Sequence, residues 1–237
     1  MIEILGLEKR FGAVRALAGV DLRIATGRVT AVLGPNGSGK TTLIKGILGL
    51  ARPDAGRVVV DGVEVDGVGA YRRRIGYMPQ SPPFPENLTP AEVLQMLRDV
   101  RGSVEQPDEE LLVTFGLERE MGKPFRTLSG GTRQKVNAAL AFLFDPAVLI
   151  LDEPTAGLDP VSSSALKDRI RRERERGKTV VLTSHIMPEV EELADEVVFL
   201  LEGSVRFAGA ALALKAEMGE SSLERAIARM MSRKVAA

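Results

Sequence analysis

The chain has 237 residues, with 32 lysine and arginine side chains against 32 aspartate and glutamate side chains, so its formal net charge is zero. This balance argues against a free-standing nucleic-acid-binding protein, which usually carries a basic excess, and we expect no nucleic-acid partner. Hydrophobic residues make up 44% and charged residues 27%, as in an ordinary globular protein, and the absence of cysteine excludes disulfides, thiolate metal sites and cysteine catalysis.

The first residues of the chain carry several charges and no apolar core segment, so they do not predict a signal peptide. The longest apolar candidate, residues 138–151, is interrupted by Asp145 and Pro146 and falls short of the roughly 18 apolar residues that a spanning helix needs. We therefore expect any membrane association to come through a partner.

Strand signals alternate with helix signals along the chain, which predicts an α/β fold with a mostly parallel sheet covered by helices. The first strands are expected to form an N-terminal antiparallel β layer, and Asp61-Gly62 and Glu202-Gly203 predict hairpins. The expected strands are residues 2–7, 20–24, 28–33, 57–60, 63–65, 147–151, 179–184, 197–201 and 205–207.

The character of the sequence changes at residue 79, because prolines at positions 79, 82, 83, 85 and 90 restrict the backbone and disfavour helix. From residue 91 to 116 the pattern turns helical, with a polar break at 102–108. We interpret residues 81–128 as a helical lobe inserted into an α/β core. The predicted parts of this single domain, residues 1–237, are the core at 1–80 and 129–208, the lobe at 81–128 and a C-terminal helical tail at 209–237.

Two further helices are predicted in the second half of the chain. The helix at 162–176 carries a run of charges at 169–176, which we interpret as a solvated, salt-bridged face without function. In the tail, Ser221 and Glu224 predict a capping box. The apolar face of that last helix is expected to carry Leu223, Ile227, Met230 and Met231.

The loop after the strand at 28–33 has the pattern G-x-x-x-x-G-K-T, which is typical of phosphate binding. Its glycines let backbone N–H groups converge on phosphate oxygens, and the helix at 41–50 directs its positive end at the same anion. Lys40 is expected to bridge the β- and γ-phosphates, and the Thr41 hydroxyl to hold Mg²⁺. A glycine turn that merely precedes a helix is the structural alternative, but the strand-loop-helix context argues against it.

A second chemical signal is Asp152-Glu153, which ends the apolar run at 147–151. A carboxylate at the end of a buried strand suits a Mg²⁺-linked acid in phosphoryl transfer, and Glu153 could polarise water for attack on the γ-phosphate. Alone this pair is weak evidence for a catalytic site, since strands often stop at acidic residues. Together with the phosphate-binding loop at residues 34–41 it becomes strong evidence.

A third element is the segment 128–135, Leu-Ser-Gly-Gly-Thr-Arg-Gln-Lys, which precedes an expected helix at 132–144. It provides a second helix N-terminus able to bind an anion. By itself the segment is better explained by Ser129 as an N-cap followed by a glycine turn.

Together these segments resemble the ABC ATPase family, with its P-loop NTPase core, in order and from about residue 2 to 210. The resemblance is carried by the Walker A loop at residues 34–41, the Q-loop glutamine Gln80, the signature sequence at 128–135, the Walker B pair Asp152-Glu153, the D-loop at 157–159 and the switch histidine His185. It implies that ATP is bound by Phe11, Gly34, Pro35, Asn36, Gly37, Ser38, Gly39, Lys40, Thr41, Thr42, Gln80, Ser129, Gly130, Gly131 and Asp159, with Mg²⁺ on Thr41, Gln80 and Asp152 and catalysis by Glu153 and His185.

The resemblance also implies a head-to-tail dimer that sandwiches two ATP molecules, with Ser129, Gly130 and Gly131 contacting the γ-phosphate of the partner's nucleotide. One departure from the family is Thr132, where glutamine is usual, so the contacts of the longer amide are in question. The backbone donors of the two glycines do not depend on that side chain.

Three aromatic or histidine residues need separate interpretation. His185 is the only histidine; it ends the strand at 179–184, where α/β ligand sites form, and the resemblance makes it a γ-phosphate contact. Phe11 lies in a β layer, where an aromatic is usually core, and only the resemblance indicates adenine stacking. Phe84 either packs inside the helical lobe or faces a coupling helix of a membrane subunit, and the sequence favours neither.

The resemblance implies an ATP-hydrolysing motor of a transporter, which works with a transmembrane permease and lies in the cytoplasm, peripheral to the inner face of the membrane. The alternative is a soluble non-transport ABC ATPase, such as a cluster-assembly factor. Residues 87–90, 128–137 and 223–229 are similar to ATPases of copper or nitrous-oxide-reductase maturation transporters. Nothing in the sequence names the cargo, its direction or the permease.

Overall fold

The structure is a computed structural model that describes residues 1–65, 69–102 and 106–233. The chain divides into two compact units. The first comprises Met1–Tyr71 and Val181–Ala237, and the second comprises Arg72–Val180. The predicted limits of the helical lobe, 81–128, remain a prediction.

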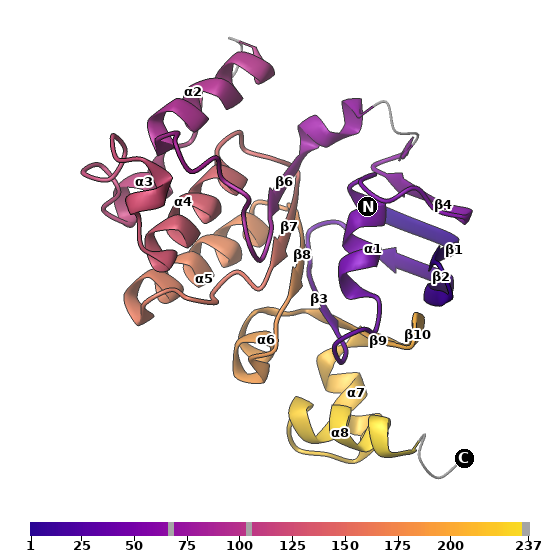
Figure 1. The fold of residues 1–237 in the computed structure, drawn as a ribbon. Helices are drawn as coiled ribbons and strands as arrows, with labels where there is room; N and C mark the ends of the chain where they lie inside the picture. The colour runs from indigo at the N-terminus through magenta and orange to yellow at the C-terminus, as the bar shows by residue number, and fades with distance from the viewer. Residues whose placement is uncertain (66–68, 103–105, 234–237) are drawn as a thin grey trace. The chain divides into compact units, whose positions relative to one another are not determined.

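The first unit contains a four-stranded antiparallel sheet, which has the strand order β2-β1-β4-β5 (Figure 1). Its strands are β1 (Ile2–Phe11), β2 (Val14–Ile24), β4 (Ala55–Val60) and β5 (Val63–Glu64). Val60 pairs with Val63 across Asp61-Gly62, as the hairpin prediction requires. The predicted β layer is therefore present, and its first two strands are longer than expected because they extend toward a tight turn.

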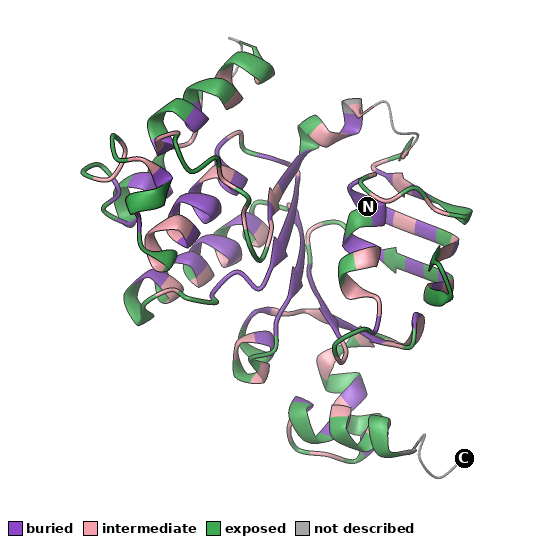
Figure 2. Cartoon of the chain, viewed as in Figure 1, coloured by how far each residue is buried: buried purple, intermediate pink, exposed green. Residues whose placement is uncertain are grey.

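A second group of strands in this unit starts from β3 (Val29–Leu33), which pairs in parallel with β9 (Glu196–Leu201). Strand β10 (Ser204–Ala210) returns antiparallel to β9, which confirms the predicted hairpin. Every residue of β3 is buried (Figure 2), as in a strand covered on both faces. The sheet is mixed, with parallel and antiparallel pairs, and α1 (Lys40–Ile47) follows β3 directly.

The first unit also contains three helices after β8: α6 (Met187–Leu193), which precedes β9, and α7 (Ala211–Met218) and α8 (Leu223–Arg233), which follow β10. The Glu191 carboxylate joins them, since it accepts hydrogen bonds from Lys215 Nζ at 3.2 Å and from the Leu223 N–H at 2.9 Å. The predicted capping box on Ser221 is wrong, because α8 begins one residue later. Ser222 is the cap, and its Oγ accepts from the Arg225 N–H at 3.3 Å.

In the second unit β6 (Ile75–Met78) pairs in parallel with β7 (Val148–Asp152). A Cβ on Gly76 would lie 2.0 Å from the carbonyl oxygen of Ala141, so only glycine lets this strand approach α4 (Gly130–Phe142) so closely. After β7 the chain forms α5 (Pro160–Glu175) and enters β8 (Thr179–Thr183), whose five residues are buried. The chain passes from the second unit to the first within β8.

The second unit also contains short helices that follow the proline-rich segment. They are α2 (Pro90–Arg101), α3 (Glu110–Thr114) and η2 (Phe125–Thr127), whereas η1 (Ala70–Arg74) precedes the prolines, at the point in the sequence where the first unit gives way to the second. Thr89 and Glu92 form a complete capping box at the start of α2, which explains why the helix begins directly after the prolines. Phe84 stacks on the fully buried Phe125, with ring centroids 4.1 Å apart, so it packs within this unit rather than standing free.

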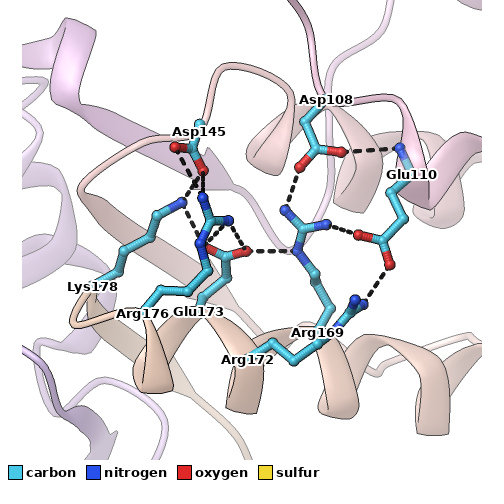
Figure 3. Close-up of polar contacts among 8 residues, drawn as sticks. All are labelled: Asp108, Glu110, Asp145, Arg169, Arg172, Glu173, Arg176 and Lys178. Carbon is cyan, nitrogen blue, oxygen red and sulfur yellow. Dashed lines mark hydrogen bonds and ion pairs between the residues drawn. The ribbon is translucent and has the colours of Figure 1, made fainter.

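A cluster of eight charged side chains lies along α5 (Figure 3). Its members are Asp108, Glu110, Asp145, Arg169, Arg172, Glu173, Arg176 and Lys178. Arg169 is 2% exposed and Glu173 is 1% exposed. The prediction of a solvated helix face is therefore wrong for these two residues, because α3 and the segment around Asp145 cover them.

Among the described residues, no helix is both long and apolar enough to cross a membrane.

Candidate functional site

The loop between β3 and α1 has a backbone that only glycine can supply at two positions. A Cβ on Gly34 would lie 2.1 Å from the carbonyl oxygen of Leu200, and a Cβ on Gly39 would lie 2.4 Å from that of Ala16. Both glycines also have positive φ angles, 150° and 107°. The loop is therefore packed so tightly against its own unit that its backbone conformation is set before any ligand arrives.

The polar groups of this loop fit an anion. Lys40 Nζ donates to the carbonyl oxygens of Gly34 at 2.7 Å and Pro35 at 3.1 Å, so the ammonium group lies over the loop. The Ser38 hydroxyl is buried and has no hydrogen-bond partner in the described part of the chain, and α1 has no side-chain cap for its first N–H groups. Unsatisfied donors at a helix N-terminus next to a lysine are what a phosphate group would satisfy. The remaining predicted contacts, Asn36, Gly37, Thr41 and Thr42, lie on this same loop and the first turn of α1.

Phe11 is the last residue of β1, and 54% of its surface is exposed. Lys9 Nζ lies 5.4 Å from the centroid of its ring. The alternative interpretation, in which Phe11 packs in the core, is therefore wrong. An exposed aromatic face is available for stacking on a flat ligand.

The two predicted site carboxylates of the second unit, Asp152 and Glu153, lie at the edge where β6 and β7 end. Met78 pairs with Leu151, so the residues that follow, Pro79-Gln80 and Asp152-Glu153, leave the two strands side by side. Asp152 and Glu153 are each 8% exposed, whereas Gln80 is exposed. Burial, and then the nearby charge of Asp152, raise the pKa of the Tyr77 hydroxyl above its usual value, so this tyrosine stays protonated.

Glu153 has a φ angle of 53°, in the left-handed region that non-glycine residues rarely adopt. Such strained positions cluster at functional sites, where the surrounding structure fixes a side chain in place. The Glu153 carbonyl accepts from the Ala156 N–H at 3.1 Å, which closes the turn that carries the carboxylate.

The oxygen donors of Thr41, Gln80 and Asp152 suit Mg²⁺, which is usually bound through one or two carboxylates with substrate phosphates completing the shell. No group of three histidine or acidic side chains that could hold a metal by themselves occurs within the described ranges. The predicted donors are thus of the type that Mg²⁺ binds together with a nucleotide, and their sharing of one ion remains a prediction.

At the start of α4, Ser129 is the N-cap, as the structural interpretation of this segment proposed. Its Oγ accepts from the Thr132 N–H at 3.1 Å and lies 2.9 Å from the Thr132 hydroxyl. Thr132 therefore supports the cap itself and does not extend outward. A Cβ on Gly130 would meet nothing within 4 Å, so the space beside these first N–H groups is open.

Asp159 caps α5, since its carboxylate accepts from the Ser162 N–H at 2.9 Å. It also forms an ion pair with Lys135 of α4 at 2.7 Å. The hydrogen bond from Lys135, followed by those from Ser162, holds the pKa of Asp159 far below its usual range. The structure thus joins the D-loop residue to the helix that carries the signature sequence.

His185 follows the carboxyl end of β8 in the first unit, where it is exposed. The preceding residue, Ser184, accepts from the Ile186 N–H at 3.0 Å through its Oγ, which closes a turn under the histidine. The side chain is therefore not a core histidine.

One polar residue of α4 was missed by the sequence interpretation. Asn137 is 4% exposed, and its Nδ2 donates to the carbonyl oxygen of Pro79 at 2.8 Å. The signal was present, because an asparagine amid Val136, Ala138 and Ala139 interrupts an apolar helix face and needs a buried partner.

Comparison with known proteins places this arrangement in context. Residues 17–156 match the ABC transporter family. The daunorubicin resistance ATP-binding protein DrrA3 of Streptomyces coeruleorubidus is 39% identical over 232 residues, which cover 94% of this chain and 72% of that protein. The sulfate/thiosulfate import ATP-binding protein CysA of Caulobacter vibrioides is 40% identical, over 88% of this chain and 64% of its own length. The lantibiotic transport ATP-binding protein SrtF of Streptococcus pyogenes is 34% identical, over 86% and 89%.

Solved structures give the same result for the fold. The ATP-binding subunit of an ABC transporter superposes with a TM-score of 0.90 at 32% identity, covering 98% of this chain and 99% of that one. The ATP-binding cassette MJ0796, a dimer in a post-hydrolysis state with ADP and phosphate, superposes with a TM-score of 0.80 at 27% identity, covering 89% and 98%.

Proposed function

Because this chain belongs to the ABC transporter family and has the fold of its ATP-hydrolysing cassettes, we propose that it is the motor subunit of a transporter. In this proposal two copies close head to tail on two ATP molecules and reopen after hydrolysis, and this movement drives a separate transmembrane permease. The chain then works in the cytoplasm, at the inner face of the membrane.

The observation that carries the proposal is that one chain has two open helix N-termini suited to phosphate. One is the glycine loop before α1, with Lys40 above it and the unpaired Ser38 hydroxyl within it. The other is the start of α4, where Ser129 caps the helix beside the open space at Gly130. One nucleotide does not need both from the same chain, so the second is available to a nucleotide on a second copy. The dimers of MJ0796 support this interpretation.

Each predicted site residue has its own role in the proposed hydrolysis of ATP. The loop N–H groups and Lys40 bind and orient the phosphates, and Phe11 stacks on adenine. Thr41, Gln80 and Asp152 would hold Mg²⁺, which neutralises charge on the β- and γ-phosphates when it is bound. Glu153 accepts the proton of the water whose oxygen attacks the γ-phosphorus, while ADP leaves. His185 donates a hydrogen bond to a γ-phosphate oxygen and keeps the water in line, and Asp159 contributes to the nucleotide site.

Transport is favoured over the alternative of a soluble cluster-assembly ATPase because the relatives' names refer to resistance, import and lantibiotic transport. Their cargoes differ widely, so the similarity does not select one. Copper or nitrous-oxide-reductase maturation remains a prediction that rests only on residues 87–90, 128–137 and 223–229.

The test is the oligomeric state of Glu153→Gln with ATP and Mg²⁺, measured by size-exclusion chromatography with light scattering. This substitution keeps the shape of the side chain but removes the proton acceptor, so we expect an ATP-dependent dimer and nearly complete loss of hydrolysis. The matched control is the double variant with Lys40→Ala, which should stay monomeric because it does not bind ATP. Normal turnover by Glu153→Gln would refute its assigned role. Co-purification of a soluble partner in place of a permease from native membranes would favour the alternative.

A further inference from the structure

The buried side of α4 carries two amide side chains, one of which reaches the residue that follows β6. Asn137 is 4% exposed and Gln134 is 6% exposed. Asn137 Nδ2 donates to the Pro79 carbonyl oxygen at 2.8 Å and to Gln134 Oε1 at 3.3 Å. Gln134 Nε2 is buried and donates to nothing in the described part of the chain. Buried amides without a structural reason are costly, so this pair calls for an explanation.

The contacted carbonyl belongs to the peptide that leads into Gln80. Three constraints meet there. Met78 is fully buried and pairs with Leu151 in the sheet. The ring of Pro79 fixes its φ angle. The bond from Asn137 then fixes the orientation of the Pro79 carbonyl, and therefore of the whole Pro79–Gln80 peptide plane.

Gln80 itself is exposed, and its backbone nitrogen belongs to the peptide plane that Asn137 holds. Its neighbours across the strand pair are Asp152 and Glu153, because β6 and β7 run in parallel register. Where the Gln80 amide oxygen lies relative to the Asp152 carboxylate therefore depends on the peptide that Asn137 holds. A shift of this peptide would displace one predicted Mg²⁺ ligand relative to the other.

We propose that Asn137 is a positioning residue for Gln80, through which the signature helix α4 directly supports the metal-binding edge of β6 and β7. This inference rests on the proposed function, because it assigns Gln80 to Mg²⁺. The N-cap of the same helix is Ser129, about two turns earlier, so Asn137 and the start of the signature segment are connected by one continuous helix.

The first measurement needs neither nucleotide nor activity. Hydrogen exchange of the backbone amides at residues 80 and 81 reports how firmly the peptide is held. Asn137→Ala removes the donor, so we expect exchange there to rise by about twofold to tenfold, the loss associated with one hydrogen bond. The matched control is Val136→Ala, which removes two buried methyl groups from the same helix but no hydrogen bond to Pro79, and should leave these amides unchanged. Should Asn137→Ala fold poorly, Asn137→Leu keeps the branched shape of the side chain and removes both its donor and its acceptor. Unchanged exchange in a folded Asn137 variant overturns the proposal.

The second measurement is the Mg²⁺ concentration for half-maximal ATPase activity, set beside ATP binding in EDTA. Asn137→Ala should raise the Mg²⁺ requirement by about twofold to tenfold and leave metal-free ATP binding unchanged. In a double-mutant cycle with Gln80→Ala, the second substitution should add nothing, because Asn137 acts through Gln80. Additive effects overturn the inference and leave the proposed function standing. If Gln80→Ala alone leaves the Mg²⁺ requirement unchanged, the metal role of Gln80 in the proposed function is wrong, and the exchange result still decides whether Asn137 holds the peptide.

Discussion

Replacing Arg169 with alanine should destabilise the protein more than any other single change in the charged cluster along α5 (Figure 3). The Arg169 side chain is only 3% exposed and forms ion pairs with Asp108, Glu110 and Glu173. Its guanidinium group also lies 5.5 Å from the centroid of the Phe142 ring. Removing this one cation therefore affects three carboxylates and one aromatic contact together.

The size of the effect follows from what each carboxylate retains. Breaking a buried ion pair by removing one partner costs about 3–5 kcal/mol, because the remaining charge is left unpaired in a poor solvent. Glu173 is almost fully buried but keeps Lys178 and Arg176 as partners. The side chains of Asp108 and Glu110 are 27% and 42% exposed, so water screens them once the arginine is gone. We therefore expect the lower end of that range, about 3 kcal/mol.

The assay is thermal unfolding of Arg169→Ala at neutral pH. A loss of about 3 kcal/mol should lower the Tm by about 6–12 °C in a chain of this size. The matched control is Arg172→Ala, since Arg172 lies on the same helix and contacts the same Glu110 at 2.6 Å but is 51% exposed. An exposed ion pair contributes at most about 1 kcal/mol, so the control should change the Tm by only a few degrees. A Tm for Arg169→Ala no lower than that of Arg172→Ala would refute the claim that burial makes this cluster costly to break.

Three further outcomes are expected. Burial alone would raise the pKa of Asp108, but hydrogen bonds from Arg169 and from the Glu110 N–H outweigh it and hold that pKa below its usual value. The stabilisation is therefore present above about pH 4 and lost on acidification, so the Tm difference between wild type and Asp108→Asn should shrink below that pH. Gly34→Ala should weaken ATP binding more than tenfold, because its Cβ would lie 2.1 Å from a carbonyl oxygen. Gly37→Ala has open space around its Cβ and carries only the backbone strain of a φ angle of 78°, so it should weaken binding less in the same titration. Phe11→Ala should raise the Kd for ATP about tenfold and leave the Tm within a few degrees. Phe11→Tyr keeps the stacking face and should bind ATP normally. Equal affinities for the unchanged chain and both variants would contradict adenine stacking.

Much of the fold could be predicted because its signals are local. The apolar runs before residues 34 and 152, the Asp-Gly and Glu-Gly hairpins and the glycine-rich loop are each set by neighbouring residues. The order of the family motifs then supplied the site residues, whose roles remain a proposal. Helix ends were less accurate, as Ser222 in place of Ser221 shows, since adjacent serines have equal capping power and only packing selects between them.

The errors concern residues whose environment comes from distant segments. Arg169 reads as a surface charge because its partners Asp108 and Glu110 lie about sixty positions earlier in the chain. Phe84 could not be assigned until Phe125 was seen to stack on it. Asn137 was read as part of a motif, although its bond to Pro79 spans two elements that sequence periodicity treats separately.

The positive φ of Glu153 implies a conflict between folding and chemistry at this position. Glycine or asparagine adopts this backbone at lower cost, so Glu153→Gly or Glu153→Asn should melt at a higher temperature than the natural protein, whereas Glu153→Gln, which inherits the strained backbone, should not. A glutamate in a backbone conformation that glycine would adopt at lower cost is a residue that the chain keeps for a purpose other than stability. Engineers who select this protein for heat resistance should therefore expect residue 153 among the first substitutions to appear, together with loss of turnover.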